Sequence, residues 1–187
     1  MQILSQEVIE IKTAAVKTAV CGVVGALSLV FMLGGVLFPF ATYAAPAASA
    51  CLLLPIVYEY RQKTAFVMYC AISALAFFIV PDPECVFMFV FVFGLYTVIK
   101  FSVDRIKKPF LRFTIKFIYI NAMLSAMYGL LIFLFPAIPA VTELYEYTFG
   151  FALALIALFN LTFFIYDKAV EKLLILYVRR FRKKIFR

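Results

Sequence analysis

The positively charged residues of this chain all fall at alternate ends of its long apolar stretches. The 18 Lys and Arg residues lie before residue 18, in a short turn at residues 59–63, in the segment 100–116 and in the tail 168–187. The intervening connections, residues 39–46, 81–85 and 136–146, contain no Lys or Arg. Positively charged loops stay on the cytoplasmic side during membrane insertion. The pattern therefore predicts six transmembrane helices with both termini in the cytoplasm.

The apolar stretches give the approximate bounds of these helices. A helix needs about 20 apolar residues to cross a hydrocarbon core roughly 30 Å thick. The expected spans are residues 18–38, 41–58, 64–80, 85–99, 117–135 and 147–166. The third and fourth are short, so either neighbouring helices shield them or one is partly re-entrant, and the charge alternation favours full crossing. We therefore expect an all-α, six-helix transmembrane domain at residues 1–167 and a basic juxtamembrane cytoplasmic helix at residues 168–187.

The composition excludes several classes of protein. The chain is 66% hydrophobic, whereas soluble domains are about 45–50% apolar. The net charge of +8 comes from residues that flank spans, so it predicts contact with lipid headgroups and not with nucleic acid. There is no His, the four Cys form no CxxC pair, and no HExxH, Ser/His pair or phosphate-binding glycine loop occurs. We expect no catalytic site, no metal and no cofactor.

The outer connections combine carboxylates with aromatic residues. Two interpretations remain open: the carboxylates bind a cation or a polar amine, or they are ordinary solvated loop charges. Tyrosines within the expected spans are candidates to line a cavity beneath this rim. The candidate substrate-binding residues are Tyr43, Tyr69, Asp82, Glu84, Tyr128, Glu143 and Glu146.

Asn121 and Asn160 are among the few polar residues inside the expected spans. Intramembrane amides are often functional, but they also form hydrogen bonds between helices. The pattern favours a structural bond between the fifth and sixth spans over a contact with a ligand.

Small residues recur along the first span at spacings of three or four. Small side chains at this spacing let two helix backbones approach closely. The partner is either the small-residue start of the second span or another protein. The candidate interface residues are Ala15, Ala19, Gly22 and Ala26.

Apolar and basic residues alternate at helical spacing in the tail. This pattern predicts a basic amphipathic helix, which either continues the sixth span or bends along the inner leaflet. It is either an anchor for anionic lipid or a docking helix for a cytoplasmic partner. The residues assigned to lipid headgroups are Arg179, Arg180, Arg182, Lys183 and Lys184.

In length, span number and orientation the chain resembles the substrate-binding S component of energy-coupling factor transporters. Those proteins carry an AxxxA pattern on the first span, which Ala15 and Ala19 match here. The resemblance implies a bacterial inner-membrane protein whose first span docks on a transmembrane T component driven by two ATPases. It also implies a vitamin-like substrate, and a loop at residues 39–46 that closes the outer binding site.

Two hypotheses follow, and they predict different structures. A transport subunit predicts an outward-facing cavity between residues 40–45 and the acidic outer loops. A membrane scaffold or assembly subunit, recruiting a partner or anionic lipid through its basic tail, predicts a packed bundle without a cavity.

Overall fold

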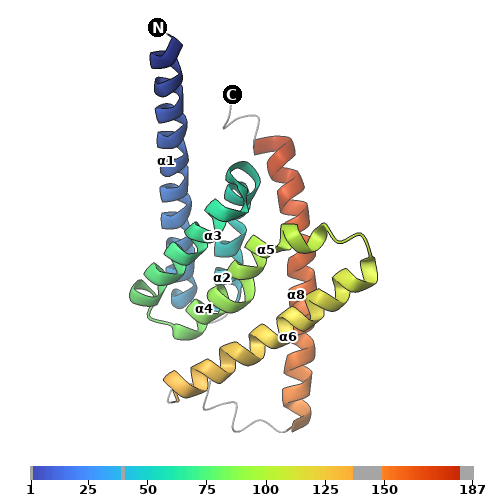
Figure 1. The fold of residues 1–187 in the computed structure, drawn as a ribbon. Helices are drawn as coiled ribbons and strands as arrows, with labels where there is room; N and C mark the ends of the chain where they lie inside the picture. Colours follow the sequence, from blue (N-terminus) through green and yellow to red (C-terminus); the bar gives the residue numbers. More distant parts are fainter. Residues whose placement is uncertain (1, 39–40, 137–148, 182–187) are drawn as a thin grey trace.

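The structure, a computed structural model, describes residues 2–38, 41–136 and 149–181, and all regular elements in them are helical. Figure 1 shows the long helices crossing one another, with the start of α1 and the end of α8 at the same end of the molecule. The elements are α1 (Gln2–Leu37), α2 (Ala44–Cys51), α3 (Leu54–Ile79), α4 (Pro83–Phe87), the π-helix η2 (Met88–Gly94), α5 (Leu95–Asp104), α6 (Pro109–Leu134), α8 (Phe149–Leu176) and the π-helix η3 (Tyr177–Phe181).

Five helical segments of the described chain are long and apolar enough to cross a membrane. They are Ala15–Leu37, Leu54–Ile79, Pro83–Asp104, Pro109–Leu134 and Gly150–Arg180. Large apolar side chains cover their outer surfaces; Phe78 is 86% exposed and Phe133 is 79% exposed. Surfaces of this kind are stable only against lipid or another apolar surface. The protein is therefore an all-helical, multi-pass membrane protein, as the sequence predicts.

The expected second span is not one uninterrupted helix. The structure divides residues 41–58 between α2 and the first turns of α3. Pro55 lies at the start of α3. Because proline has no N–H to donate to the carbonyl four residues earlier, the helix is interrupted there, and the N–H groups of Leu52 and Leu53 bond to carbonyls only three residues back.

The turn predicted at residues 59–63 appears as a sharp break within α3. Arg61 has φ 69° and ψ 160°, and it is the only non-glycine residue with a positive φ in the described chain. An L-residue in this region is strained by about 1–3 kcal/mol, so surrounding contacts must hold it. The α3 helix changes direction at this residue (Figure 1).

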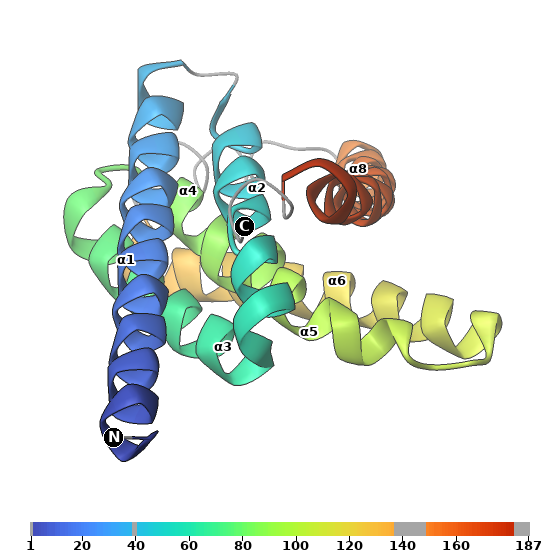
Figure 2. The ribbon, with the colours of Figure 1, turned by 90° about the horizontal axis from the view of Figure 1, so that it is seen from above.

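The segment α4–η2–α5 is the centre of the fold. In its apolar window 61% of the residues are buried, against 17–22% in the other four long segments. Neighbouring helices therefore shield the short fourth span. Shielding was one of the two explanations that the sequence allowed for its length. In Figure 1, α4 and α5 lie between α3 and α6, and Figure 2 shows α1 and α2 side by side.

Tyrosine hydroxyls satisfy the carbonyls around the π-helical turn of this central segment. The Tyr69 hydroxyl of α3 donates to the Val90 carbonyl oxygen at 2.8 Å. The Tyr119 hydroxyl of α6 donates to the carbonyl oxygen of Phe91 at 2.7 Å. A π-turn disturbs the regular helical ladder, and in an apolar environment each displaced carbonyl needs another donor.

The α8 helix passes without a break through residues 167 and 168 and ends in η3. The tail therefore continues the last span, at least as far as Phe181, and does not bend away at residue 168. The expected division between the transmembrane domain and the basic helix falls inside one continuous helix.

The α1 helix packs on α2 through Ser28, Met32 and Gly35, which lie on one helical face and are buried. The Ser28 hydroxyl donates to the carbonyl oxygen of Ser49 at 3.3 Å. A Cβ atom on Gly35 would lie 2.4 Å from the Cβ of Ala45. Only glycine permits this close approach of the two helices.

We predict that Gly35→Ala destabilises the protein by about 1–3 kcal/mol, because the added methyl group overpacks the contact with Ala45. Gly34→Ala is the matched control, since a Cβ at Gly34 meets nothing within 4 Å. Thermal unfolding in detergent, followed by cysteine-reactive fluorescence, measures both. Equal melting temperatures for the two variants would show that the Gly35 contact contributes nothing.

Candidate functional site

Glu84 joins three parts of the chain at the end of the bundle predicted to face outward. Its Oε1 atom accepts a hydrogen bond from the Tyr43 hydroxyl at 3.0 Å and from the Tyr128 hydroxyl at 3.2 Å. Tyr43 directly precedes α2, Glu84 lies in the first turn of α4, and Tyr128 belongs to α6. Three residues predicted to bind substrate are thus brought together by the fold.

The other predicted substrate-binding residues have different positions. The Asp82 carboxylate accepts from the backbone N–H of Glu84 at 3.0 Å, so it caps α4. Tyr69 is 92% buried and bonds to the π-helical segment, so it belongs to the core. Glu143 and Glu146 lie outside the described residues.

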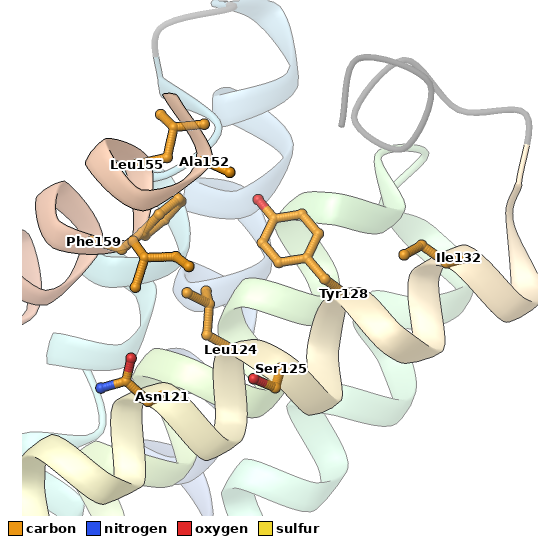
Figure 3. A pocket seen from close by; sticks show the side chains of 9 residues that line it. Asn121, Leu124, Ser125, Tyr128, Ile132, Ala152, Leu155 and Phe159 are labelled. Atoms are coloured by element: carbon orange, nitrogen blue, oxygen red, sulfur yellow. The ribbon is translucent and has the colours of Figure 1, made fainter. Parts of the chain in front are cut away.

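A cavity of about 390 Å³ lies between α6 and α8. Its volume falls within the range of roughly 300–1,000 Å³ typical of small-molecule sites. Figure 3 shows side chains of α6, including Tyr128, on one side and those of α8, including Phe159, on the other. The lining residues are Asn121, Leu124, Ser125, Tyr128, Ile132, Ala152, Leu155, Ile156 and Phe159.

The Glu84 cluster adjoins this cavity through two aromatic rings. Tyr128 lines the cavity and its hydroxyl donates to Glu84. The ring of Tyr43 packs edge-on against Phe159, with 5.6 Å between ring centroids. The transport hypothesis predicts a cavity between residues 40–45 and the acidic outer loops, and residues 137–148 of those loops lie outside the described residues. The cavity between α6 and α8 is a different one, and Tyr43 contacts Phe159 on its wall.

The amides of Asn121 and Asn160 bond to each other across α6 and α8. Asn121 Nδ2 donates to Asn160 Oδ1 at 3.1 Å, and Asn160 Nδ2 donates to Asn121 Oδ1 at 3.2 Å. The predicted interhelical bond is confirmed. Asn121 also lines the cavity, so the amide pair closes one end of a space whose walls are otherwise mostly apolar.

This arrangement has the chemistry of a binding site for a mostly apolar ligand. Apolar side chains line most of the cavity, and the polar groups gather at Asn121, Ser125 and Tyr128. Such a site excludes water around an apolar ligand and orients it through a few hydrogen bonds. In the part of the chain that the structure describes, no group of three His, Cys, Asp or Glu residues is placed to hold a metal ion.

A second polar cluster, at the opposite ends of α5, α6 and α8, was not predicted. Asp167 of α8 is 5% exposed. Its Oδ1 accepts from the Tyr96 hydroxyl at 2.5 Å and pairs with the Lys100 ammonium, and its Oδ2 lies 2.8 Å from Lys116 Nζ. Asp104 pairs with the same two lysines at 3.0 and 2.8 Å. Two buried lysines therefore face two carboxylates.

The sequence assigns Lys100 and Lys116 to a cytoplasmic connection and gives Asp167 no role. In the structure, Asp167 lies within the candidate span Gly150–Arg180 and is buried against both lysines. The spacing of Lys100 and Asp104, one helical turn apart, was a visible signal. Nothing in the sequence indicated that Lys116 and Asp167 meet, because 51 residues separate them.

The candidate interface residues of the first span all lie on an exposed face of α1. Ala15, Ala19, Gly22 and Ala26 are exposed, and a Cβ at Gly22 would meet nothing within 4 Å. The packing of α1 on α2 uses Ser28, Met32 and Gly35 instead. The four residues therefore do not serve internal packing on α2, and the structure leaves their face accessible.

Of the residues assigned to lipid headgroups, Arg179 and Arg180 are exposed in η3. Arg182, Lys183 and Lys184 lie outside the described residues.

Comparison with protein-family models, with curated proteins and with solved structures finds no match to this chain.

We predict that Asp167→Asn destabilises the protein by about 3 kcal/mol or more, because Lys100 and Lys116 remain buried with only one carboxylate between them. Glu171→Gln is the matched control on the same helix. Its pair with Lys168 is exposed and 3.5 Å long, and such surface pairs contribute about 0–1 kcal/mol. Thermal unfolding in detergent compares the two, and equal effects would contradict the assigned role of Asp167.

Proposed function

We propose that this protein is the substrate-binding integral membrane subunit of an ATP-driven uptake transporter of the energy-coupling factor type. The observation that carries the proposal is the cavity between α6 and α8, with Glu84 held by two tyrosines at its edge. A scaffold that acts through its basic tail needs no such cavity. Partner subunits, and not this chain, would use ATP.

The proposed orientation has six crossings with both termini in the cytoplasm of a bacterial cell. Four crossings are the segments Ala15–Leu37, Pro83–Asp104, Pro109–Leu134 and Gly150–Arg180, and the part of α3 after the break at Arg61 is a fifth. The remaining crossing is α2 together with the start of α3, ending at that break. This assignment turns the chain back at the basic residues 61–63 and leaves Asp82 and Glu84 outside, in agreement with the positive-inside rule. The membrane would be the inner (plasma) membrane.

The proposed substrate is a small, vitamin-like metabolite that is mostly apolar and either neutral or cationic. The apolar walls favour an uncharged ring or short chain. Glu84 favours an amine or hydroxyl donor and disfavours an anion, since a second negative charge near it would be repelled. The hydroxyls of Tyr43 and Tyr128 would then be shared between Glu84 and the ligand.

The exposed small-residue face of α1 is proposed to dock on the transmembrane T component. Close helix packing through small residues is favourable in lipid because it maximises van der Waals contact. Ala19 and Gly22 lie near the centre of this face, and neither is needed for the packing of α1 on α2.

We predict that Ala152→Phe abolishes substrate binding while the protein stays folded, because the ring would fill the cavity that Ala152 lines. Ala154→Phe is the matched control, since Ala154 is exposed two residues further along α8 and does not line the cavity. Native mass spectrometry of both variants, gently purified beside the wild type, measures the co-purifying metabolite. Equal metabolite occupancy in all three proteins would overturn the assignment of this cavity.

We further predict that Gly22→Leu prevents co-purification of T-type and ATPase subunits without lowering the melting temperature. A Cβ at Gly22 meets nothing within 4 Å, so we expect added bulk on this exposed face to disturb an external partner and not the fold. Ala74→Leu, on the exposed face of α3, controls for added apolar bulk. If the wild type itself purifies with no such subunits from its own host, the transporter assignment fails even where a metabolite is bound.

A further inference from the structure

A second cavity, of about 830 Å³, lies where the N-terminal part of α1, the break in α3 and the end of α5 come together. Four cationic side chains line it: Lys17 of α1, Arg61 and Lys63 at the break, and Arg105 directly after α5. No Asp or Glu is among the described residues that line it. Glu59 lies only two residues before Arg61 in the sequence, but it lines a different groove, together with Ala19 and Pro55.

These four cations differ from Lys100, Lys116 and Lys168 in their carboxylate partners. Lys100 and Lys116 each pair with two carboxylates, and Lys168 pairs with Glu171. By contrast, none of the four cavity residues forms an ion pair with a carboxylate of the described chain. Four like charges around one cavity create a strong positive potential, which an anion would neutralise.

Hydrogen bonds of Gln62 hold the break in α3 in place, and its neighbours Arg61 and Lys63 line this cavity. The Gln62 side chain donates to the carbonyl oxygen of Val98 at 3.0 Å and accepts from the Ser102 hydroxyl at 2.9 Å. Both partners belong to α5. Gln62 therefore fixes the strained turn against α5, with Arg61 and Lys63 on either side of it. Strained backbone of this kind concentrates at ligand-binding sites.

Tyr60 also lines this cavity. Its ring lies under the Lys17 ammonium, with 5.8 Å from Nζ to the ring centroid. Its hydroxyl is buried, so it is not exposed to a ligand in the cavity. The guanidinium and ammonium groups of the four cations form a donor set suited to phosphate oxygens.

We propose that this cavity binds a phosphate-bearing anion, with Arg61, Lys63 and Arg105 as its principal donors. The phosphate belongs either to a soluble metabolite or to the headgroup of an anionic lipid at the inner leaflet. The lipid source rests on the orientation given under the proposed function, whereas the phosphate chemistry does not. The site is separate from the cavity between α6 and α8.

The test uses the full chain in phosphatidylcholine nanodiscs and two probes. Isothermal titration with inorganic phosphate measures the soluble source. Native mass spectrometry after addition of 5% phosphatidic acid, whose headgroup is a phosphomonoester, measures the lipid source. Binding of phosphate in pure phosphatidylcholine supports a soluble ligand, and retention of phosphatidic acid alone supports a lipid. Binding of neither probe overturns the proposal.

Arg61→Gly is the decisive variant, because it is expected to weaken phosphate binding without lowering the melting temperature. Glycine adopts a positive φ without strain, so the melting temperature is expected to rise or stay unchanged. Loss of a charged donor is expected to weaken phosphate binding by roughly 10- to 100-fold. The double variant Lys63→Gln, Arg105→Gln tests the remaining donors while it leaves the backbone of Arg61 unchanged.

Lys107→Gln is the matched control. It removes an exposed cation two residues from Arg105 that does not line the cavity. Unchanged binding in this variant, with loss in the other two, supports a built site. Equal weakening in all variants, or full binding in Arg61→Gly, would overturn the proposal, because net positive charge alone would then explain the attraction. None of these residues belongs to the cavity of the proposed transport function, so the two proposals fail independently.

Discussion

The carboxylate of Asp167 connects three helices whose outer surfaces are otherwise apolar. Buried between Lys100 and Lys116, it ties α8 to α5 and α6. A buried charge without a partner is strongly unfavourable. The three helices must therefore pack so that Asp167 meets both lysines. Further along the same pair of helices, Asn121 and Asn160 exchange two hydrogen bonds. Polar contacts thus hold α6 and α8 together over one part of their length, and the cavity opens between them beyond the amide pair.

Tyrosine has the same role at both the centre and the edge of the bundle. Tyr69 and Tyr119 donate to carbonyl oxygens of the π-helical segment, and Tyr43 and Tyr128 donate to Glu84. A phenol places one hydrogen-bond donor at the end of a large apolar ring, so it can satisfy a polar group without carrying charge into the apolar interior. The irregular centre of the fold and the candidate site therefore depend on the same chemistry. In the proposed function, the pair at Glu84 would exchange one partner for the ligand.

The two cavities have opposite character because different constraints formed them. The space between α6 and α8 is mostly apolar, as expected between membrane-spanning helices that diverge. The space at Arg61 is lined by four cations that form no ion pair with a carboxylate of the described residues, and it lies where α3 changes direction. Insertion alone requires positive charge on that side of the membrane. It does not require that four cations surround one cavity, nor that Gln62 braces a strained turn against α5. Those two features distinguish a built site from a topological signal.

The sequence by itself determined the helical class, the membrane environment and the position of the turn near Arg61, because these follow from apolar length and charge, which are local properties. It also selected Tyr43, Glu84 and Tyr128 as candidates. Only the tertiary structure decided that these three meet, that Tyr69 belongs to the core and that the cavity lies between α6 and α8. It likewise decided that Lys100, Lys116 and Asp167 form one buried cluster. Each of these facts depends on which faces of distant helices pack together, and a carboxylate 51 residues from its lysine leaves no periodic trace in the sequence.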